Sequence, residues 1–121
     1  LHEGATLAFG TDSPVVDVNP WSGIYTAVTR QDAKTHEPKG GWLASERISA
    51  ADAIRAYTAG AAASAGRENE IGKLAAGMWA DIAAFDRNPL VDAEQCPELM
   101  LETHAIATFL AGRPVFDSRK A

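Results

Sequence analysis

The sequence is poor in cysteine, in long apolar runs and in basic charge. Its single Cys96 cannot form an internal disulfide, which fits a reducing compartment and leads us to expect a cytoplasmic protein. No apolar stretch approaches the roughly 18 to 20 residues that a membrane-spanning helix needs. The 11 basic residues are outnumbered by 16 acidic ones and form no run that could neutralise a phosphate backbone. We therefore expect neither nucleic acid nor a membrane as a partner.

An initiator methionine is also missing. The chain opens on Leu1 and reaches an apolar run within a few residues, so we expect it to be a piece cut from a longer protein. Its 121 residues, of which 46% are hydrophobic, can supply one modest core. Composition thus predicts a globular chain, and the fold class has to come from the pattern along it.

The first part of the chain has the pattern of a strand, a loop and a helix, which is typical of an α/β fold. Residues 5–10 form a short apolar run that ends at Gly10, which predicts a buried strand with Asp12 just past its carboxyl end. Turn-forming residues then lead to Pro20. Over residues 21–30, apolar side chains recur with helical spacing, at Trp21, Ile24, Tyr25 and Val28.

The middle of the chain predicts a surface connector followed by helices. Residues 31–46 are polar and broken by proline and glycine, so we expect them on the surface with Trp42 and Leu43 turned inward. Ser49 and Asp52 have capping-box spacing, which predicts a helix start. Its apolar stripe is expected at Ile54, Tyr57, Thr58 and Ala61, with a break near Thr58 and a short second helix closed by glycine near Gly66. The many alanines imply close packing.

After Ile71 the pattern changes to short extended segments, so we expect β structure. Residues 81–86 and 103–111 predict two strands, and Gly112-Arg113 a two-residue turn into residues 114–117. This part predicts a small β domain that ends in a hairpin.

Three segments, in this order, resemble the C-terminal part of the amidohydrolase superfamily, in particular its family 3 branch, which includes N-substituted formamide deformylase. They are F-G-T-D-S-P with G-I-Y-T-A-V-T-R (9–14 and 23–30), I-S-A-A-D-A-I-R-A-Y-T-A-G-A-A (48–62) and I-G-K-L-A-A-G-M-W-A-D-I-A-A-F-D (71–86). The resemblance implies that residues 1–70 are the C-terminal part of a TIM-type barrel with flanking helices. Residues 71–121 would then be strands of the small, composite β domain beside it, so that the fold is incomplete.

The same resemblance implies that residues 5–10 are the eighth barrel strand and that Asp12 is the acidic residue after it, where barrel enzymes place catalytic groups. Asp12 would bind or approach a divalent metal, zinc by expectation, and carry a proton from the metal-activated water to a leaving nitrogen. The other family ligands, beginning with a His-x-His, have no counterpart here. His2, His36 and His104 stand singly, so we expect the metal only in the complete enzyme.

Less specific interpretations stand beside these. Asp12 could be a plain turn residue. Asp17 and Asn19 could line the mouth of the substrate site or be plain turn residues. Arg30 could pair with a substrate carboxylate, but we expect it to stabilise a helix end instead. Asp81 is expected to fix a turn or to accept backbone hydrogen bonds in the β domain.

Two functions remain open. In the first, the chain is the C-terminal portion of a metal-dependent hydrolase that cleaves amide, formamide or cyclic amide C–N bonds in a small molecule, and the isolated chain is inactive. In the second, it is a stand-alone binding or assembly module. Strand edges left without partners predict self-association of the isolated chain.

Overall fold

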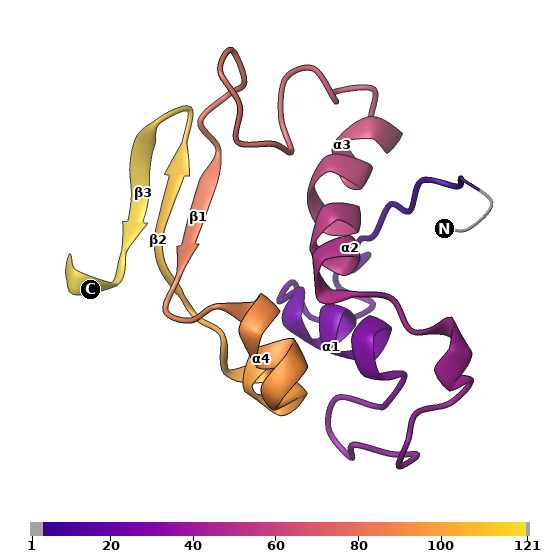
Figure 1. Ribbon diagram of the computed structural model, residues 1–121. Helices are drawn as coiled ribbons and strands as arrows, with labels where there is room; N and C mark the ends of the chain where they lie inside the picture. The colour runs from indigo at the N-terminus through magenta and orange to yellow at the C-terminus, as the bar shows by residue number, and fades with distance from the viewer. Residues whose placement is uncertain (1–3, 121) are drawn as a thin grey trace. The chain divides into compact units, whose positions relative to one another are not determined.

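The computed structural model describes residues 4–120, which form short helices and one small sheet (Figure 1). The chain divides into two compact units. One unit contains residues 4–9, 56–87 and 104–120, and the other contains residues 10–55 and 88–103. No helix of the described residues is both long and apolar enough to cross a membrane. In chain order the elements are α1 (Trp21–Thr29), η1 (Ala44–Glu46), α2 (Ala50–Arg55), η2 (Ala56–Gly60), α3 (Ala61–Ser64), β1 (Ile82–Phe85), α4 (Pro89–Gln95), η3 (Pro97–Glu102), β2 (Ala105–Leu110), β3 (Arg113–Asp117) and η4 (Ser118–Lys120).

This arrangement is α/β, as predicted, with antiparallel strands in the small sheet. The compact units do not follow a single cut near residue 70, because each gathers segments from distant parts of the sequence. The division into a barrel-derived part (1–70) and a β-domain part (71–121) concerns the complete fold and stays a prediction.

The unit of residues 10–55 and 88–103 contains only helices and is the helical unit of the chain. Helix α1 is its centre. Its predicted stripe is confirmed at Trp21, Ile24 and Tyr25, which are buried, and Val28 is half-buried. The helix contacts both α2 and η3. Small or unbranched residues of those elements complete the core, namely Ala50, Ala53 and Met100.

Helix α2 begins where the capping pattern predicts. The backbone N–H of Asp52 donates to the Ser49 hydroxyl oxygen at 3.0 Å, and that hydroxyl donates to the Asp52 carboxylate at 2.7 Å. In a full capping box the Asp52 carboxylate would accept the Ser49 backbone N–H, but here it accepts the Ser49 hydroxyl. One otherwise unsatisfied amide of the first turn is satisfied in this way.

The predicted break near Thr58 is confirmed as the π-helical segment η2, after which α3 forms a single turn and Gly66 takes a φ of +69°. The predicted apolar stripe is wrong. Thr58 is exposed, and Ile54, Tyr57 and Ala61 are only half-buried. The buried positions of α2, η2 and α3 are small residues, Ala50, Ala53, Ala56, Gly60 and Ala62, because only small side chains allow a close approach of neighbouring backbone.

The sheet has the order β1-β2-β3, and both pairs are antiparallel. The hairpin turn is Ala111-Gly112, one residue earlier than predicted, since Leu110 pairs with Arg113. Both turn residues have positive φ, +49° and +76°, as a type I′ turn requires. Asp81 fixes this turn, as expected, because its carboxylate accepts the Ala111 N–H at 2.8 Å.

The strand predicted for residues 5–10 does not form, and this segment is irregular. A buried apolar strand is regular only when neighbouring strands satisfy its ladder. Here the Phe9 N–H donates to the Ala56 carbonyl at 3.0 Å, and the Phe9 ring meets Tyr57 edge-on at 5.5 Å. Half-buried Leu7 and Phe9 alternate with exposed neighbours, so the strand-like periodicity remains without a ladder.

Helix α4 and the 3-10 helix η3 occupy residues for which we expected β structure. Asn88 caps α4 by accepting the Leu90 N–H at 3.1 Å, and Pro89 occupies the first turn. Asn followed by Pro is a helix-start signal, but the extended pattern on either side of it led us to expect β structure.

Gly72 and Gly77 of the third family segment make a matched pair for testing close packing. Their φ values are +88° and +86°, but a Cβ at Gly72 would lie 2.9 Å from the Thr58 carbonyl oxygen and from the Ala62 Cβ, whereas Gly77 faces open space. We expect Gly77→Ala to cost about 1 kcal/mol of unfolding free energy from backbone strain alone. Gly72→Ala should cost about 3 kcal/mol, because steric overlap adds to that strain. Urea unfolding of both variants measures the difference, and equal losses would reject the close-approach explanation.

Asp86 gives a pH prediction. The His104 backbone N–H donates to its carboxylate at 3.0 Å and, with nearby His104 and Arg87, holds the pKa of Asp86 below its ordinary value. A lowered folded-state pKa adds stability above the unfolded value of about 3.9, and this stability is lost as the pH falls through the folded value.

Asp86→Asn keeps an oxygen acceptor but removes the charge. From about pH 5 to about pH 2.5, a range that spans the ordinary aspartate pKa, its urea midpoint should fall less than that of the unchanged chain. Glu68→Gln, at an exposed carboxylate of the same unit, is the control. Parallel acid profiles for the chain and for Asp86→Asn would contradict the assignment.

Candidate functional site

Asp12 lies at the first position of a hydrogen-bonded turn. Its carbonyl accepts the Val15 N–H at 2.9 Å, which closes the four-residue turn Asp12 to Val15. Asp12 has a φ of +50°, a left-handed conformation that is uncommon outside glycine and that Asp and Asn tolerate best. The side chain is exposed. The turn thus presents the Asp12 carboxylate on a fixed backbone.

The loop after this turn is tied to the start of α1. The Asp17 carboxylate accepts the Asn19 N–H at 2.9 Å, and the Asn19 side-chain oxygen accepts the Trp21 N–H at 3.0 Å. Trp21 is itself buried in the core of the unit. Asp17 and Asn19 therefore have the turn role that was one of their two sequence interpretations, and they connect the Asp12 loop to a rigid helix.

Asp12 differs from most other aspartates of the chain in what its carboxylate contacts. Asp32, Asp81, Asp86 and Asp117 accept backbone N–H groups, as Asp17 does, and Asp52 contacts Ser49 and Arg55. In the part of the chain that the structure describes, the Asp12 side chain has no such internal partner. Its carboxylate is therefore available to a group outside these residues.

No group of three or more histidine, cysteine, aspartate or glutamate side chains able to hold a metal ion occurs among residues 4–120. His36 is 3.0 Å from the Tyr25 hydroxyl, and His104 is 3.5 Å from Asp86. His2 lies outside the described residues. Asp12 is thus one possible oxygen donor, and the donor set of the described residues does not by itself amount to a metal site.

A polar network around the buried Tyr25 was missed by the sequence analysis. The fully buried Tyr25 hydroxyl donates to the Gln31 side-chain oxygen at 3.0 Å, and the Gln31 amide nitrogen donates to the His36 carbonyl at 2.9 Å. Because the single Tyr25 proton is used, His36 Nδ1 donates to the Tyr25 oxygen, so this ring nitrogen carries a proton. Burial raises the pKa of Tyr25 above its ordinary value. This network holds the connector against α1.

Glu98 and Cys96 extend the same network without forming a nucleophile. The Glu98 carboxylate lies 3.9 Å from His36 Nδ1 and 3.4 Å from the Cys96 sulfur. Its own backbone N–H, the Cys96 thiol and His36 together hold the pKa of Glu98 below its ordinary value. The thiol donates to a carboxylate, so these contacts give no activation of Cys96 as a thiolate.

Arg30 has a structural role, as expected. It is the left-handed C-cap of α1, its side chain donates to the Trp42 carbonyl at 3.1 Å, and its guanidinium lies 5.3 Å from the Trp42 ring centre. The expectation that Trp42 and Leu43 turn inward is wrong, since they are 62% and 54% exposed. Arg30 covers Trp42 in place of the protein core.

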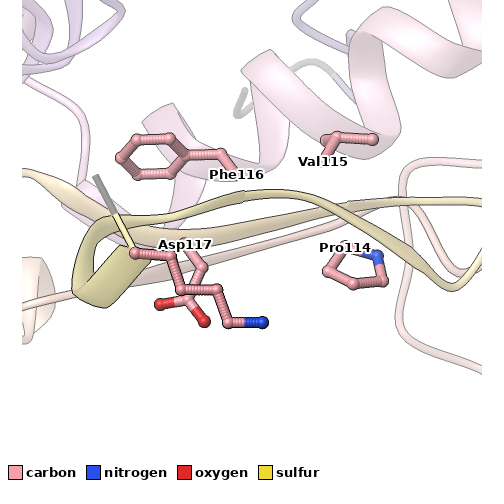
Figure 2. Close-up of a pocket in the computed structure, with 5 residues that line it drawn as sticks. Pro114, Val115, Phe116 and Asp117 are labelled. Atoms are coloured by element: carbon pink, nitrogen blue, oxygen red, sulfur yellow. The ribbon is translucent and has the colours of Figure 1, made fainter.

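Asp12 lines neither of two pockets that lie among the described residues. One, of about 340 Å³, lies beside β3 and is lined by Pro114, Val115, Phe116, Asp117 and Lys120 (Figure 2). The other, of about 300 Å³, lies in the helical unit and is lined by Val28, Ser49, Ala50, Ala51, Leu90, Ala93 and Glu94. The candidate site in the described residues is an exposed carboxylate on a fixed turn.

Comparison with known proteins gives a consistent class. Residues 1–116 match the model of the amidohydrolase family. Protein LONG AFTER FAR-RED 3 of Arabidopsis thaliana is 34% identical over 116 residues, which are 96% of this chain and 19% of that protein. N-substituted formamide deformylase of Arthrobacter pascens is 30% identical over 92 residues, 74% of this chain and 16% of that enzyme. The crystal structure of an amidohydrolase from Thermotoga maritima MSB8 shares the fold over 96% of this chain and 24% of its own, with a TM-score of 0.60 and 19% identity.

A partial α/β fold that coincides with part of an amidohydrolase structure, together with the match over residues 1–116, defines the class. The chain belongs to the amidohydrolase family. The resemblance that we inferred from its three segments is confirmed. The chain spans less than a fifth of the length of the Arabidopsis and Arthrobacter relatives and 24% of the Thermotoga chain.

Proposed function

We propose that this chain is the C-terminal portion of a longer metal-dependent hydrolase that cleaves a C–N bond in an amide, formamide or cyclic amide. Family membership supports a hydrolase, and one relative is named for its action on N-substituted formamides. The observation that carries the proposal is the Asp12 carboxylate, exposed, fixed by a hydrogen-bonded turn and without an internal partner among the described residues. The residues before Asp12 would form the last strand of a TIM-type barrel, whose strand ends carry catalytic groups.

Asp12 would act first as a base and then as an acid. Its carboxylate oxygen takes a proton as a water oxygen forms a bond to the carbonyl carbon, and it gives that proton to the nitrogen as the C–N bond breaks with its electron pair on nitrogen. The products are a carboxylic acid and an amine. A bound divalent ion, for which we propose zinc, would supply an acidified water. The other ligands would come from residues outside this chain, so the isolated chain should be inactive, and a cytoplasmic location remains part of the proposal.

The first test changes Asp12 in the complete protein, with the upstream sequence present. Asp12→Asn should lower kcat for amide hydrolysis by about 10²- to 10⁴-fold, the usual contribution of general acid–base catalysis. Asn also tolerates the left-handed backbone, and the turn uses the Asp12 carbonyl, so the thermal unfolding midpoint should change little.

Asp17→Asn is the matched control, because an amide oxygen can still accept the Asn19 N–H, and its turnover should stay within a few-fold of the unchanged enzyme. Near-normal turnover of Asp12→Asn would remove the basis for the proposed proton transfer.

We also propose that the chain self-associates when it is isolated, through the face of the sheet that bears Val115. Val115 is an extra residue opposite the step between Thr108 and Phe109, so it points to the same side of β3 as Phe116. Figure 2 shows this pair on one side and Pro114 with Asp117 on the other. Large side chains on this face are 42% to 62% exposed, namely Ile106, Leu110, Val115 and Phe116. An apolar face of this kind beside an edge strand is a typical site of association.

Light scattering over a concentration series tests this association. The mass of the isolated chain should rise above 12.8 kDa, and Val115→Lys should reduce the increase, because a charge on an edge strand opposes pairing. Leu74→Lys, at an 81% exposed position outside the sheet, should not reduce it. A monomeric mass at the highest concentration would rule out the association.

A further inference from the structure

Two arginine side chains meet beside Gly41. Arg30 donates from Nε to the Trp42 carbonyl at 3.1 Å, and Arg47 donates from Nη2 to the Gly40 carbonyl at 2.7 Å. These carbonyls belong to the two neighbours of Gly41, whose Cα atoms are no more than about 7.6 Å apart. A Cβ at Gly41 would lie 3.1 Å from both the Arg30 Cβ and the Arg47 Nη2. The two side chains therefore flank a single residue.

Neither guanidinium is paired with a carboxylate in the part of the chain that the structure describes. Two nearby carboxylates are used elsewhere, since Asp32 accepts the Thr35 N–H and Glu37 the Lys39 N–H, each at 2.8 Å. Other arginines form close ion pairs, namely Arg55 with Asp52, Arg67 with Glu70 and Arg119 with Asp117. Two uncompensated positive charges thus lie together in a chain whose net charge is -5.

Hydrogen bonds to the backbone use only part of these two guanidiniums, each of which has five N–H donors. Arg30 is bonded through Nε alone. Arg47 is bonded through Nη2 and through Nε, which donates to the Thr29 carbonyl at the end of α1 at 3.1 Å. Capping of α1 therefore does not use the two Nη groups of Arg30 or the Nη1 group of Arg47, and these have no partner among the described residues.

The Arg30 guanidinium is also held in one orientation. It lies 5.3 Å from the centre of the Trp42 ring, and its Nε is bonded to the carbonyl of the same residue. Trp42 is exposed, so this stacked pair lies at the surface, where a dissolved ligand can reach it. A guanidinium that is already fixed loses less conformational entropy when it binds a ligand.

We propose that Arg30 and Arg47 form a binding site for a phosphate group. Two guanidiniums supply two positive charges, and a phosphate group carries a charge of about -1.5 to -2 at neutral pH. The planar fork of arginine binds two oxygens of such a group at once. A single carboxylate would leave one of the two positive charges uncompensated. This inference does not depend on the proposed hydrolase function.

Isothermal titration calorimetry of the 121-residue chain with sodium phosphate and with sodium acetate, at neutral pH and constant ionic strength, tests the site. Phosphate should bind more tightly than acetate. Arg30→Lys keeps the positive charge but removes the fork, and it should raise the Kd for phosphate about tenfold, which corresponds to one charge-assisted hydrogen bond. Arg30 is the deciding position, because Arg47 also bonds two backbone carbonyls and its replacement would disturb the loop.

Arg67→Lys is the matched control. The Arg67 guanidinium also lies over a tryptophan ring, 5.8 Å from the centre of Trp79, but it is paired with Glu70 at 2.9 Å. Its replacement should leave the Kd for phosphate unchanged. Phosphate should also raise the thermal unfolding midpoint of the unchanged chain, because it binds the folded state. If the isolated chain does not unfold cooperatively, the same titrations are made on the complete protein.

Three results would overturn the proposal. They are a lack of phosphate binding by the folded protein, equal Kd values for the unchanged protein and Arg30→Lys, and equal weakening in Arg30→Lys and Arg67→Lys. Phenyl phosphate distinguishes a phosphorylated molecule from the free ion. An aromatic ester gains contact with the exposed Trp42 ring, so a site for such a molecule should bind phenyl phosphate more tightly than inorganic phosphate, and Trp42→Ala should remove this difference.

Discussion

Close approach of backbone segments over small residues is the constraint on which the rest of this structure depends. The buried positions of α2, η2 and α3 are alanine or glycine, and large buried side chains are few, chiefly those of α1 with Met100. With so little apolar volume per element, stability must come from short distances between backbones. Gly72 shows the limit of this packing, since the space that a Cβ would occupy is already filled by the Thr58 carbonyl and Ala62. Gly72 of the third family segment is therefore required by packing as well as by its positive φ.

Sequence patterns predicted those elements whose cause is local. The spacing of Trp21, Ile24 and Tyr25 describes one helical face, and Ser49 with Asp52 supplies its own cap, so both helix positions follow from a few neighbouring residues. Elements that depend on partners distant in sequence were predicted less well. Residues 5–10 have strand composition, but a strand is regular only when a ladder is present. The hairpin turn lies one residue earlier than predicted, because Leu110 pairs with Arg113 and leaves Ala111 and Gly112 between the strands.

The same distinction applies to the candidate site. Sequence placed Asp12 in a loop and, through the family resemblance, gave it a role. Turn-forming residues were recognised there, but the hydrogen bond from the Val15 N–H to the Asp12 carbonyl and the left-handed backbone of Asp12 are seen only in the structure. The Tyr25, Gln31 and His36 network was missed for a related reason. Each residue alone is unremarkable in sequence, and only burial of the Tyr25 hydroxyl makes its two partners necessary.

The aspartates of this chain show how one side chain acquires different roles from its backbone surroundings. At Asp81 and Asp86 a backbone N–H from a distant residue meets the carboxylate, so its charge is used to hold strand ends and turns together. At Asp17 and Asp32 the N–H comes from the next few residues, and the charge stabilises a local turn. At Asp12 the turn is closed by the main-chain carbonyl, which leaves the carboxylate out of the structural hydrogen bonds. A carboxylate that makes no structural hydrogen bond can be selected for chemistry at little cost to the fold. Among these aspartates Asp12 is the one with such a carboxylate, and the proposed catalytic role therefore rests on it.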